Sequence, residues 1–233
     1  MKCIFCSTEL GPPIHKNLHE CPGCGNRRIA PADIPSKDNA WRQNRSFMLR
    51  ASSNKAKEAA RLKDAHEGQL DLLEQYVKPG AVYDVGAAGG FFMKAARDRG
   101  WQVAGNELSA SSVAWAKRAY DLDIDCCYLE DAGLPDGAFD AVVMWNVLEH
   151  VVDPVLTLRE CHRILKPGGC ILVKVPTKNA AELRRHFEWK HFTEFSRNGL
   201  DHVLKQAGFV RLVLERSAAD KVSHTIALYR KPA

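Results

Sequence analysis

Short apolar runs alternate with helical patterns from Ala81 to Tyr229, and this alternation constrains the fold more than any other feature of the sequence. Strands that alternate with helices form a mostly parallel sheet with helices on both faces. The expected strands are 81–85, 102–106, 124–129, 139–145, 170–175, 210–214 and 225–229. The expected helices are 91–99, 111–120, 153–165 and 196–206. We therefore predict an α/β domain with a doubly wound, seven-stranded sheet.

Four cysteines form two C-x-x-C pairs within the first 24 residues. They are Cys3, Cys6, Cys21 and Cys24. Four thiolates at this spacing can surround Zn²⁺ as a tetrahedron, which leaves no coordination position for chemistry. We predict a structural zinc site in a small knuckle or ribbon module. Disulfides are the competing interpretation, and rubredoxin-type iron uses a similar spacing. His15 and His19 are alternative ligands that four cysteines make unnecessary.

The sequence divides into three parts at changes in composition. We assign 1–29 to the zinc module, 30–77 to a basic linker with a helical segment, and 78–233 to the α/β domain. A helical stripe in the second part consists of Leu62, His66, Leu70, Leu73 and Val77. Residues 26–63 carry ten Lys or Arg against three acidic residues. We interpret this segment as a solvated helical face, and a surface for an anionic substrate such as RNA is the alternative.

Composition indicates a globular protein outside the membrane. No apolar run approaches the roughly 18 residues that a membrane-spanning helix needs, and cysteines and prolines interrupt the N-terminus where a signal peptide would be apolar. We expect a cytoplasmic protein. The remaining cysteines are expected to be reduced, small core residues. They are Cys126, Cys127, Cys161 and Cys170. A net charge of +5 is too small to indicate nucleic-acid binding by itself.

A glycine-rich turn follows the first expected strand and reads Asp84-Val-Gly-Ala-Ala-Gly-Gly90. Glycines here let the backbone approach a ligand and open the next helix, whose N-terminus carries partial positive charge. An acid two residues before the first glycine would repel a pyrophosphate, but it can pair with an ammonium group. Glu107 closes the second expected strand, where a carboxylate can accept hydrogen bonds from two ribose hydroxyls.

These residues resemble motif I of the class I S-adenosylmethionine-dependent methyltransferases, usually D-x-G-x-G-x-G. Further similar segments follow in order: 103–109, 134–140, 146–150 and 165–169. Together they resemble the small-molecule branch of that family, over about residues 76–229. The resemblance implies a Rossmann-like sheet that ends in an antiparallel hairpin. It also implies S-adenosylmethionine as the cofactor and methyl transfer to a small molecule.

The resemblance also assigns cofactor contacts by position. Asp84 is expected near the methionine ammonium, Gly86 and Gly90 along the methionine, and Glu107 with Leu108 at the ribose. Ala88 replaces the second motif glycine, which is tolerable if its φ is negative.

On the adenine side the family often has an acid where this chain has Tyr128. Either Glu130 or Asp131 supplies the acid, or stacking and the Leu129 backbone hold the adenine. Asn146, after the fourth strand, completes the expected cofactor residues.

His150 and His191 are the candidate bases, because an acceptor that carries a proton must lose it during methyl transfer. A structural role for each histidine is the alternative. Two other functions stay open. One is an RNA methyltransferase that binds RNA through the zinc module and the basic segment, although Asn146-Val-Leu-Glu149 differs from the N-P-P-[YF] type of tetrapeptide. The other is a non-catalytic interaction module. The acceptor and the oligomeric state are not predicted.

Overall fold

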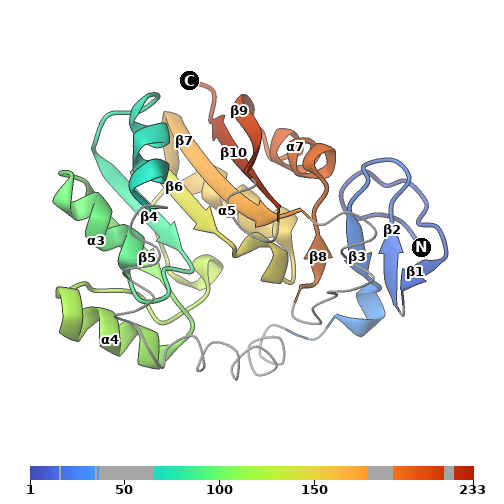
Figure 1. Ribbon diagram of the computed structural model, residues 1–233, viewed down its shortest axis with the longest axis horizontal. Helices are drawn as coiled ribbons and strands as arrows, with labels where there is room; N and C mark the ends of the chain where they lie inside the picture. Colours follow the sequence, from blue (N-terminus) through green and yellow to red (C-terminus); the bar gives the residue numbers. More distant parts are fainter. Residues whose placement is uncertain (16, 35, 37–65, 178–190, 218–222) are drawn as a thin grey trace.

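The computed structural model describes residues 1–15, 17–34, 36, 66–177, 191–217 and 223–233. Their main feature is a six-stranded sheet with helices on both faces (Figure 1). In sheet order the strands are β5 (Gln102–Asn106), β4 (Ala81–Val85), β6 (Phe139–Trp145), β7 (Leu165–Pro176), β10 (His224–Arg230) and β9 (Val210–Ser217). The predicted doubly wound α/β fold is confirmed.

The sheet is parallel at one side and antiparallel at the other. β4 pairs in parallel with β5 and β6, and β6 pairs in parallel with β7. β10 lies antiparallel between β7 and β9, which confirms the predicted closing hairpin. The C-terminal ends of the parallel strands therefore share one edge, where ligands bind in sheets of this kind.

The helices cover the two faces of the sheet unequally. α3 (Phe91–Asp98) and the helical residues 66–74 pack on one face, where Leu70, Leu73 and Phe92 are buried. α5 (Pro154–Ile164) and α7 (Arg197–Gln206) pack on the other face. α4 (Ala110–Tyr120) packs beside β5 and α3. The predicted apolar stripe is buried at His66, Leu70 and Leu73, whereas Leu62 lies outside the described residues.

The predicted strand at 124–129 does not form, and this part of the prediction was wrong. A single parallel bridge joins Asn106 to Asp125, and a 3₁₀ turn, η3 (Leu129–Asp131), follows. The Asn106 side chain donates its Nδ2–H to the Cys127 carbonyl at 3.0 Å. A side chain thus takes the place of the next ladder hydrogen bond, and the seventh strand is reduced to one residue pair.

The N-terminal residues form a second, smaller sheet of order β1-β2-β3-β8. β1 (Pro13–His15), β2 (Leu18–Glu20) and β3 (Arg27–Ile29) come from the N-terminal part, and a 3₁₀ turn, η1 (Pro31–Asp33), follows them. The fourth strand, β8 (Thr193–Glu194), comes from the chain after β7 (Figure 1). Two distant parts of the chain therefore share this sheet. The proposed division of the chain at residues 29 and 77 stays a prediction.

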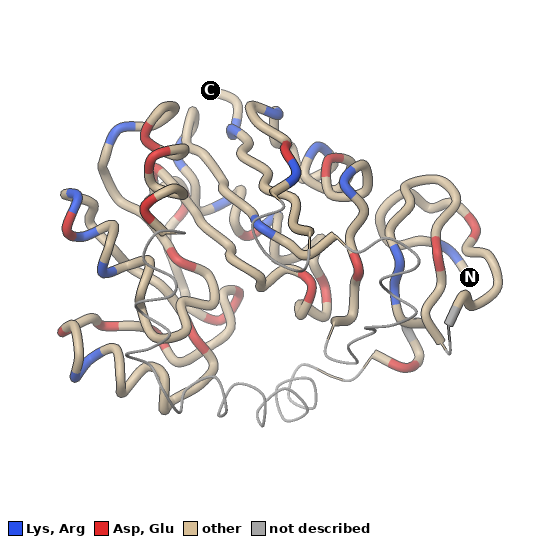
Figure 2. Tube along the Cα trace, viewed as in Figure 1, with Lys and Arg blue, Asp and Glu red and all other residues tan. Residues whose placement is uncertain are grey.

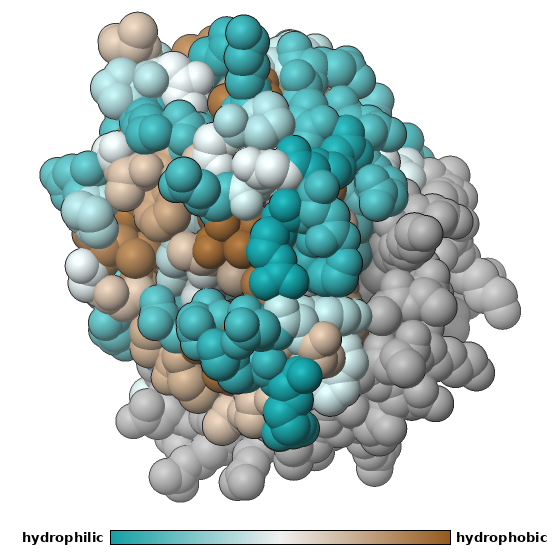
Figure 3. Space-filling view, turned by 90° about the vertical axis from the view of Figure 1, so that its left-hand side faces the viewer, coloured by the Kyte–Doolittle hydropathy of each residue, from teal (hydrophilic) through white to brown (hydrophobic). Residues whose placement is uncertain are grey.

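The described surface is mixed in charge and polarity. Basic and acidic residues are interspersed along the trace (Figure 2). One face of the molecule is mainly hydrophilic, with small, separate apolar patches (Figure 3). No helix in the described part of the chain is both long and apolar enough to span a bilayer. Most of the basic segment 26–63 lies outside the described residues.

Candidate functional site

The glycine-rich turn leaves β4 at the shared C-terminal edge of the sheet. Gly86 and Gly90 have φ angles of +70° and +71°, which favour glycine. A Cβ on Gly86 would lie 2.6 Å from Val147 Cγ2, and one on Gly90 would lie 2.7 Å from Leu122 Cδ1. The turn therefore needs both glycines, for conformation and for space.

Ala88 also has a positive φ, of +50°, so the condition under which alanine would be tolerated without strain is not met. A left-handed conformation costs an L-residue with a side chain roughly 1–2 kcal/mol. The Ala88 N–H donates to Glu107 Oε2 at 2.9 Å, and this bond helps to hold the strained residue in place. Strain of this kind collects at functional sites.

Glu107 lies at the end of β5 and is only 3% exposed. Its Oε2 accepts from Ala88 N–H, and its Oε1 accepts from Ser109 N–H at 2.8 Å. These two bonds from backbone amides fix the orientation of the carboxylate. A carboxylate fixed in this way suits two vicinal hydroxyls of a ribose.

Asp84 is 4% exposed, near the end of β4. Burial raises the pKa of Asp84 well above its usual value, and the negative charge of Glu107 raises this pKa further. Two carboxyl groups beside a glycine turn make the environment favourable for a cation such as an ammonium group. The place of the methionine ammonium beside Asp84 stays a prediction.

The residues predicted at the adenine differ in their surroundings. Leu129 is buried and Asp131 is exposed, while Tyr128 and Leu108 are half-buried. Glu130 Oε1 accepts from the Thr157 hydroxyl on α5 at 2.5 Å. Between the two candidate acids, Glu130 is thus bonded to a helix, whereas Asp131 faces solvent.

Asn146 directly follows β6 and also has a positive φ, of +55°. Asparagine tolerates this conformation better than most residues. Its N–H donates to the Lys174 carbonyl on the neighbouring strand β7 at 2.9 Å. The side chain is exposed at the shared edge, as its predicted role near the cofactor requires.

The structure brings the two candidate bases together. His150 lies in the 3₁₀ turn η4 (Leu148–His150), and its ring is 4.7 Å from the ring of His191, centroid to centroid. His191 Nδ1 lies 3.0 Å from Glu194 Oε1 on β8. Because a carboxylate accepts, Nδ1 carries the proton and Nε2 becomes the basic nitrogen. Glu149, Glu194 and His191 are buried.

The sequence reasoning did not identify Glu194, although its spacing of three residues from His191 was visible. It also missed Ser109 and Asn106, whose roles depend on backbone geometry. Cys161 and Cys170 are buried as predicted. Cys126 is exposed and Cys127 half-buried, so for Cys126 the core prediction was wrong. The loss of the predicted strand at 124–129 is the physical reason.

The four N-terminal cysteines converge as predicted. Their sulfur atoms all lie within 4.8 Å of one another, and no disulfide joins them. The Cys3–Cys24 and Cys6–Cys21 sulfur pairs are 3.8 and 3.3 Å apart. A tetrahedron with Zn–S bonds of about 2.3 Å has edges of about 3.8 Å. The Phe5 N–H points to Cys3 Sγ at 3.4 Å, as in a metal knuckle. The neighbouring His19 ring instead contacts the Gly11 carbonyl at 2.9 Å.

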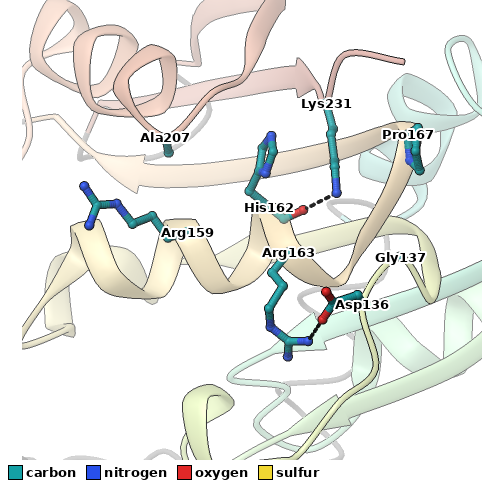
Figure 4. A pocket seen from close by; sticks show the side chains of 8 residues that line it. All are labelled: Asp136, Gly137, Arg159, His162, Arg163, Pro167, Ala207 and Lys231. Atoms are coloured by element: carbon teal, nitrogen blue, oxygen red, sulfur yellow. Dashed lines mark hydrogen bonds and ion pairs between the residues drawn. The ribbon is translucent and has the colours of Figure 1, made fainter.

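A cavity of about 510 Å³ lies away from these groups. Figure 4 shows its lining, which includes Asp136, Arg163 and Lys231. Asp136 precedes β6 and Lys231 follows β10, so the cavity opens at the N-terminal ends of the parallel strands. Arg163 bonds Asp136, and Lys231 bonds backbone carbonyls. We therefore place the functional site at the opposite edge.

Part of the chain is similar to known methyltransferases. Residues 83–173 match a family described as a methyltransferase domain. A ubiquinone biosynthesis O-methyltransferase of Chromobacterium violaceum is 35% identical over 121 residues, which are 48% of this chain and 52% of that protein. The enzyme of the same name from Idiomarina loihiensis is 35% identical over 104 residues, covering 42% and 43%. The chain thus spans about half the length of these relatives, or less.

Solved structures show the same fold. A Burkholderia thailandensis 1,6-didemethyltoxoflavin-N1-methyltransferase, solved with S-adenosylhomocysteine, has a TM-score of 0.69 and 17% identity, covering 97% of this chain and 100% of that one. The [4+2]-cyclase SpnF has a TM-score of 0.59 and 24% identity, covering 71% and 80%. The class I methyltransferase fold is confirmed. Because a cyclase shares it, the reaction must be argued from the site.

Proposed function

We propose that the protein is an S-adenosylmethionine-dependent methyltransferase that acts on a small molecule. The observation that carries the proposal is the Glu107 carboxylate, fixed by two backbone amides beside the Gly86–Gly90 turn. Together with buried Asp84, these residues fit a ligand with a ribose diol and a cationic amino acid end. The match to a methyltransferase domain and the O-methyltransferase relatives support it.

The chain's residues would divide the work between cofactor and acceptor. Glu107 would hold the ribose, Asp84 the ammonium, and the glycine turn the methionine chain. When bound, S-adenosylmethionine supplies an activated methyl group on a sulfonium. Alignment of the acceptor atom with that group is the main task of the protein, because the leaving group is neutral.

His191 and His150 would act on the acceptor substrate. Glu194 holds the His191 Nδ1–H, so Nε2 can take the proton of an acceptor hydroxyl, and the carboxylate stabilises the resulting imidazolium. The relatives named O-methyltransferases make a hydroxyl the acceptor group that we favour. His150, in contact with the His191 ring, would help to orient the acceptor or this base.

We further propose that the four N-terminal cysteines hold structural Zn²⁺. The sulfur distances support four-coordination of one ion, and the free cysteines suit a reducing, cytoplasmic environment. Within this proposal the basic segment 26–63 is a solvated surface. Binding of RNA to that segment and to the cysteine module is the alternative that the final experiment below addresses.

Calorimetry tests the cofactor assignment without a known acceptor. The protein should bind S-adenosylmethionine or S-adenosylhomocysteine at micromolar strength and should bind NAD weakly, since Asp84 would repel a pyrophosphate. Tight NAD binding with no S-adenosylmethionine binding would refute the proposal.

A further inference from the structure

The small N-terminal sheet is completed by a strand of the α/β domain that carries part of the acceptor site. Arg27 pairs with Glu194 and Arg28 with Thr193 in the β3–β8 ladder. The ladder continues where Ile29 N–H donates to the Phe192 carbonyl at 3.2 Å. We call residues 1–29 the cysteine module. The residues that follow His191 therefore depend on this module for their strand pairing.

Arg28 joins two segments of the α/β domain from within the cysteine module. The residue is 8% exposed. One terminal guanidinium nitrogen donates to Thr193 Oγ1 at 2.6 Å, and the other donates to the Val152 carbonyl at 2.5 Å. Burial lowers the pKa of Arg28 to about 10, so the side chain is still charged at neutral pH. A planar fork with several donors can make both bonds at once.

These two segments are the ones that carry the acceptor histidines. Val152 comes two residues after His150, and Thr193 comes two residues after His191. Phe192 N–H also donates to the Glu149 carbonyl at 2.9 Å, which joins the segments directly. Arg28 thus holds both of the segments that carry His150 and His191, although it belongs to neither segment.

The cysteine module is in turn built around its metal site and anchored on α7. The Ser196 hydroxyl, at the N-cap of α7, donates to the carbonyl of Cys24 at 3.0 Å. Ser196 N–H donates to Asn26 Oδ1 at 3.0 Å, and the His202 ring contacts the Phe5 carbonyl at 3.0 Å. With strands of three residues and a core as small as this, the module should not fold without its metal.

We propose that Arg28 is a positioning residue through which the metal-loaded cysteine module sets the geometry of His150 and His191. The proposal rests on the proposed function for the role of these histidines. The cofactor half, built on β4 and β5 around Asp84 and Glu107, is not part of this connection. The half of the site that binds the acceptor would therefore depend on the cysteine module, whereas the half that binds the cofactor would not.

The test compares Arg28→Met with Lys2→Met in the full, zinc-loaded chain. Lys2 is the control, because it is an exposed basic residue of the same module and takes no part in the β3–β8 ladder. Imidazole ¹⁵N spectra report the tautomer of His191, and calorimetry reports S-adenosylmethionine affinity. Arg28→Met should replace the Nδ1–H tautomer of His191 by a mixture, with zinc content and cofactor affinity unchanged. Lys2→Met should leave all three as in the wild type.

An unchanged His191 spectrum in folded, zinc-loaded Arg28→Met would overturn the proposal, as would an equal change in Lys2→Met. If Arg28→Met does not fold, Arg28→Lys takes its place, because a lysine point charge cannot hold both oxygens as the guanidinium fork does. These readouts need no acceptor. Failure of the wild-type chain to bind S-adenosylmethionine would refute the proposed function, while the histidine spectra would still decide this inference.

Discussion

Replacing Glu107 by alanine should weaken S-adenosylmethionine binding more than any other single carboxylate change. In the proposed complex the carboxylate accepts hydrogen bonds from two ribose hydroxyls, while the backbone N–H groups of Ala88 and Ser109 hold it in place. Hydrogen bonds to a charged group contribute about 1.5–3 kcal/mol each, and water that enters the vacated space recovers part of the loss. We therefore expect a loss of about 2–4 kcal/mol, a weakening of Kd by about 30- to 1,000-fold.

Glu107→Gln separates charge from shape. The amide oxygen can still accept one of the two backbone N–H groups, but the NH₂ group then faces the other donor. We expect this variant also to bind weakly, and to bind more tightly than Glu107→Ala.

Isothermal titration calorimetry with S-adenosylmethionine and S-adenosylhomocysteine measures both variants. Glu215→Gln is the control, because Glu215 is an exposed carboxylate on the edge strand β9. The reasoning is refuted if Glu107→Ala, folded as judged by circular dichroism, binds both ligands as tightly as the wild type.

Three further predictions concern stability and metal. Ala88→Gly should raise the free energy of unfolding by about 0.5–1 kcal/mol in urea titrations, because glycine relieves a φ of +50°; a decrease would contradict the strain argument. Elemental analysis should find about one zinc ion per chain, and Cys24→Ser should lose this ion. A red preparation that contains iron in place of zinc would contradict the prediction. Asp84→Asn should stabilise the ligand-free protein. Because the folded pKa of Asp84 is raised, its carboxyl costs stability as pH rises above the unfolded value of about 3.9, so the gain should be larger at pH 7.5 than at pH 5.

The sequence predicted well where one local pattern decided the structure. β4, β5 and β6 have the expected bounds, because Gly80, Gly100 and Gly137 mark turns shortly before them. Asp153 caps α5 by accepting from Val155 and Leu156 N–H, as aspartate before proline indicated. The C-x-x-C spacing likewise predicted a cluster of four sulfur atoms.

Where the prediction was wrong or incomplete, long-range contacts decided. The segment after Ile124 was expected to be a strand. Instead, the Asn106 side chain donates a hydrogen bond to the Cys127 carbonyl in that segment. A single sequence could not show that Ala88 has a positive φ, because the bond that helps to hold it comes from Glu107. The pairing of β3 with β8 joins residues more than 160 positions apart, and nothing local indicates it.

The central claim is methyl transfer from S-adenosylmethionine to a small molecule. Its most direct test uses methyl-labelled S-adenosylmethionine with a cell extract separated into small-molecule and RNA fractions. We predict label in the small-molecule fraction with the wild-type chain, strongly reduced label with Glu107→Ala, and wild-type labelling when Arg42, Arg45 and Arg50 are all reversed in charge. Label confined to RNA, reduced by that triple change and by raised salt, would contradict the account. Cofactor binding without transfer to either fraction would contradict it as well.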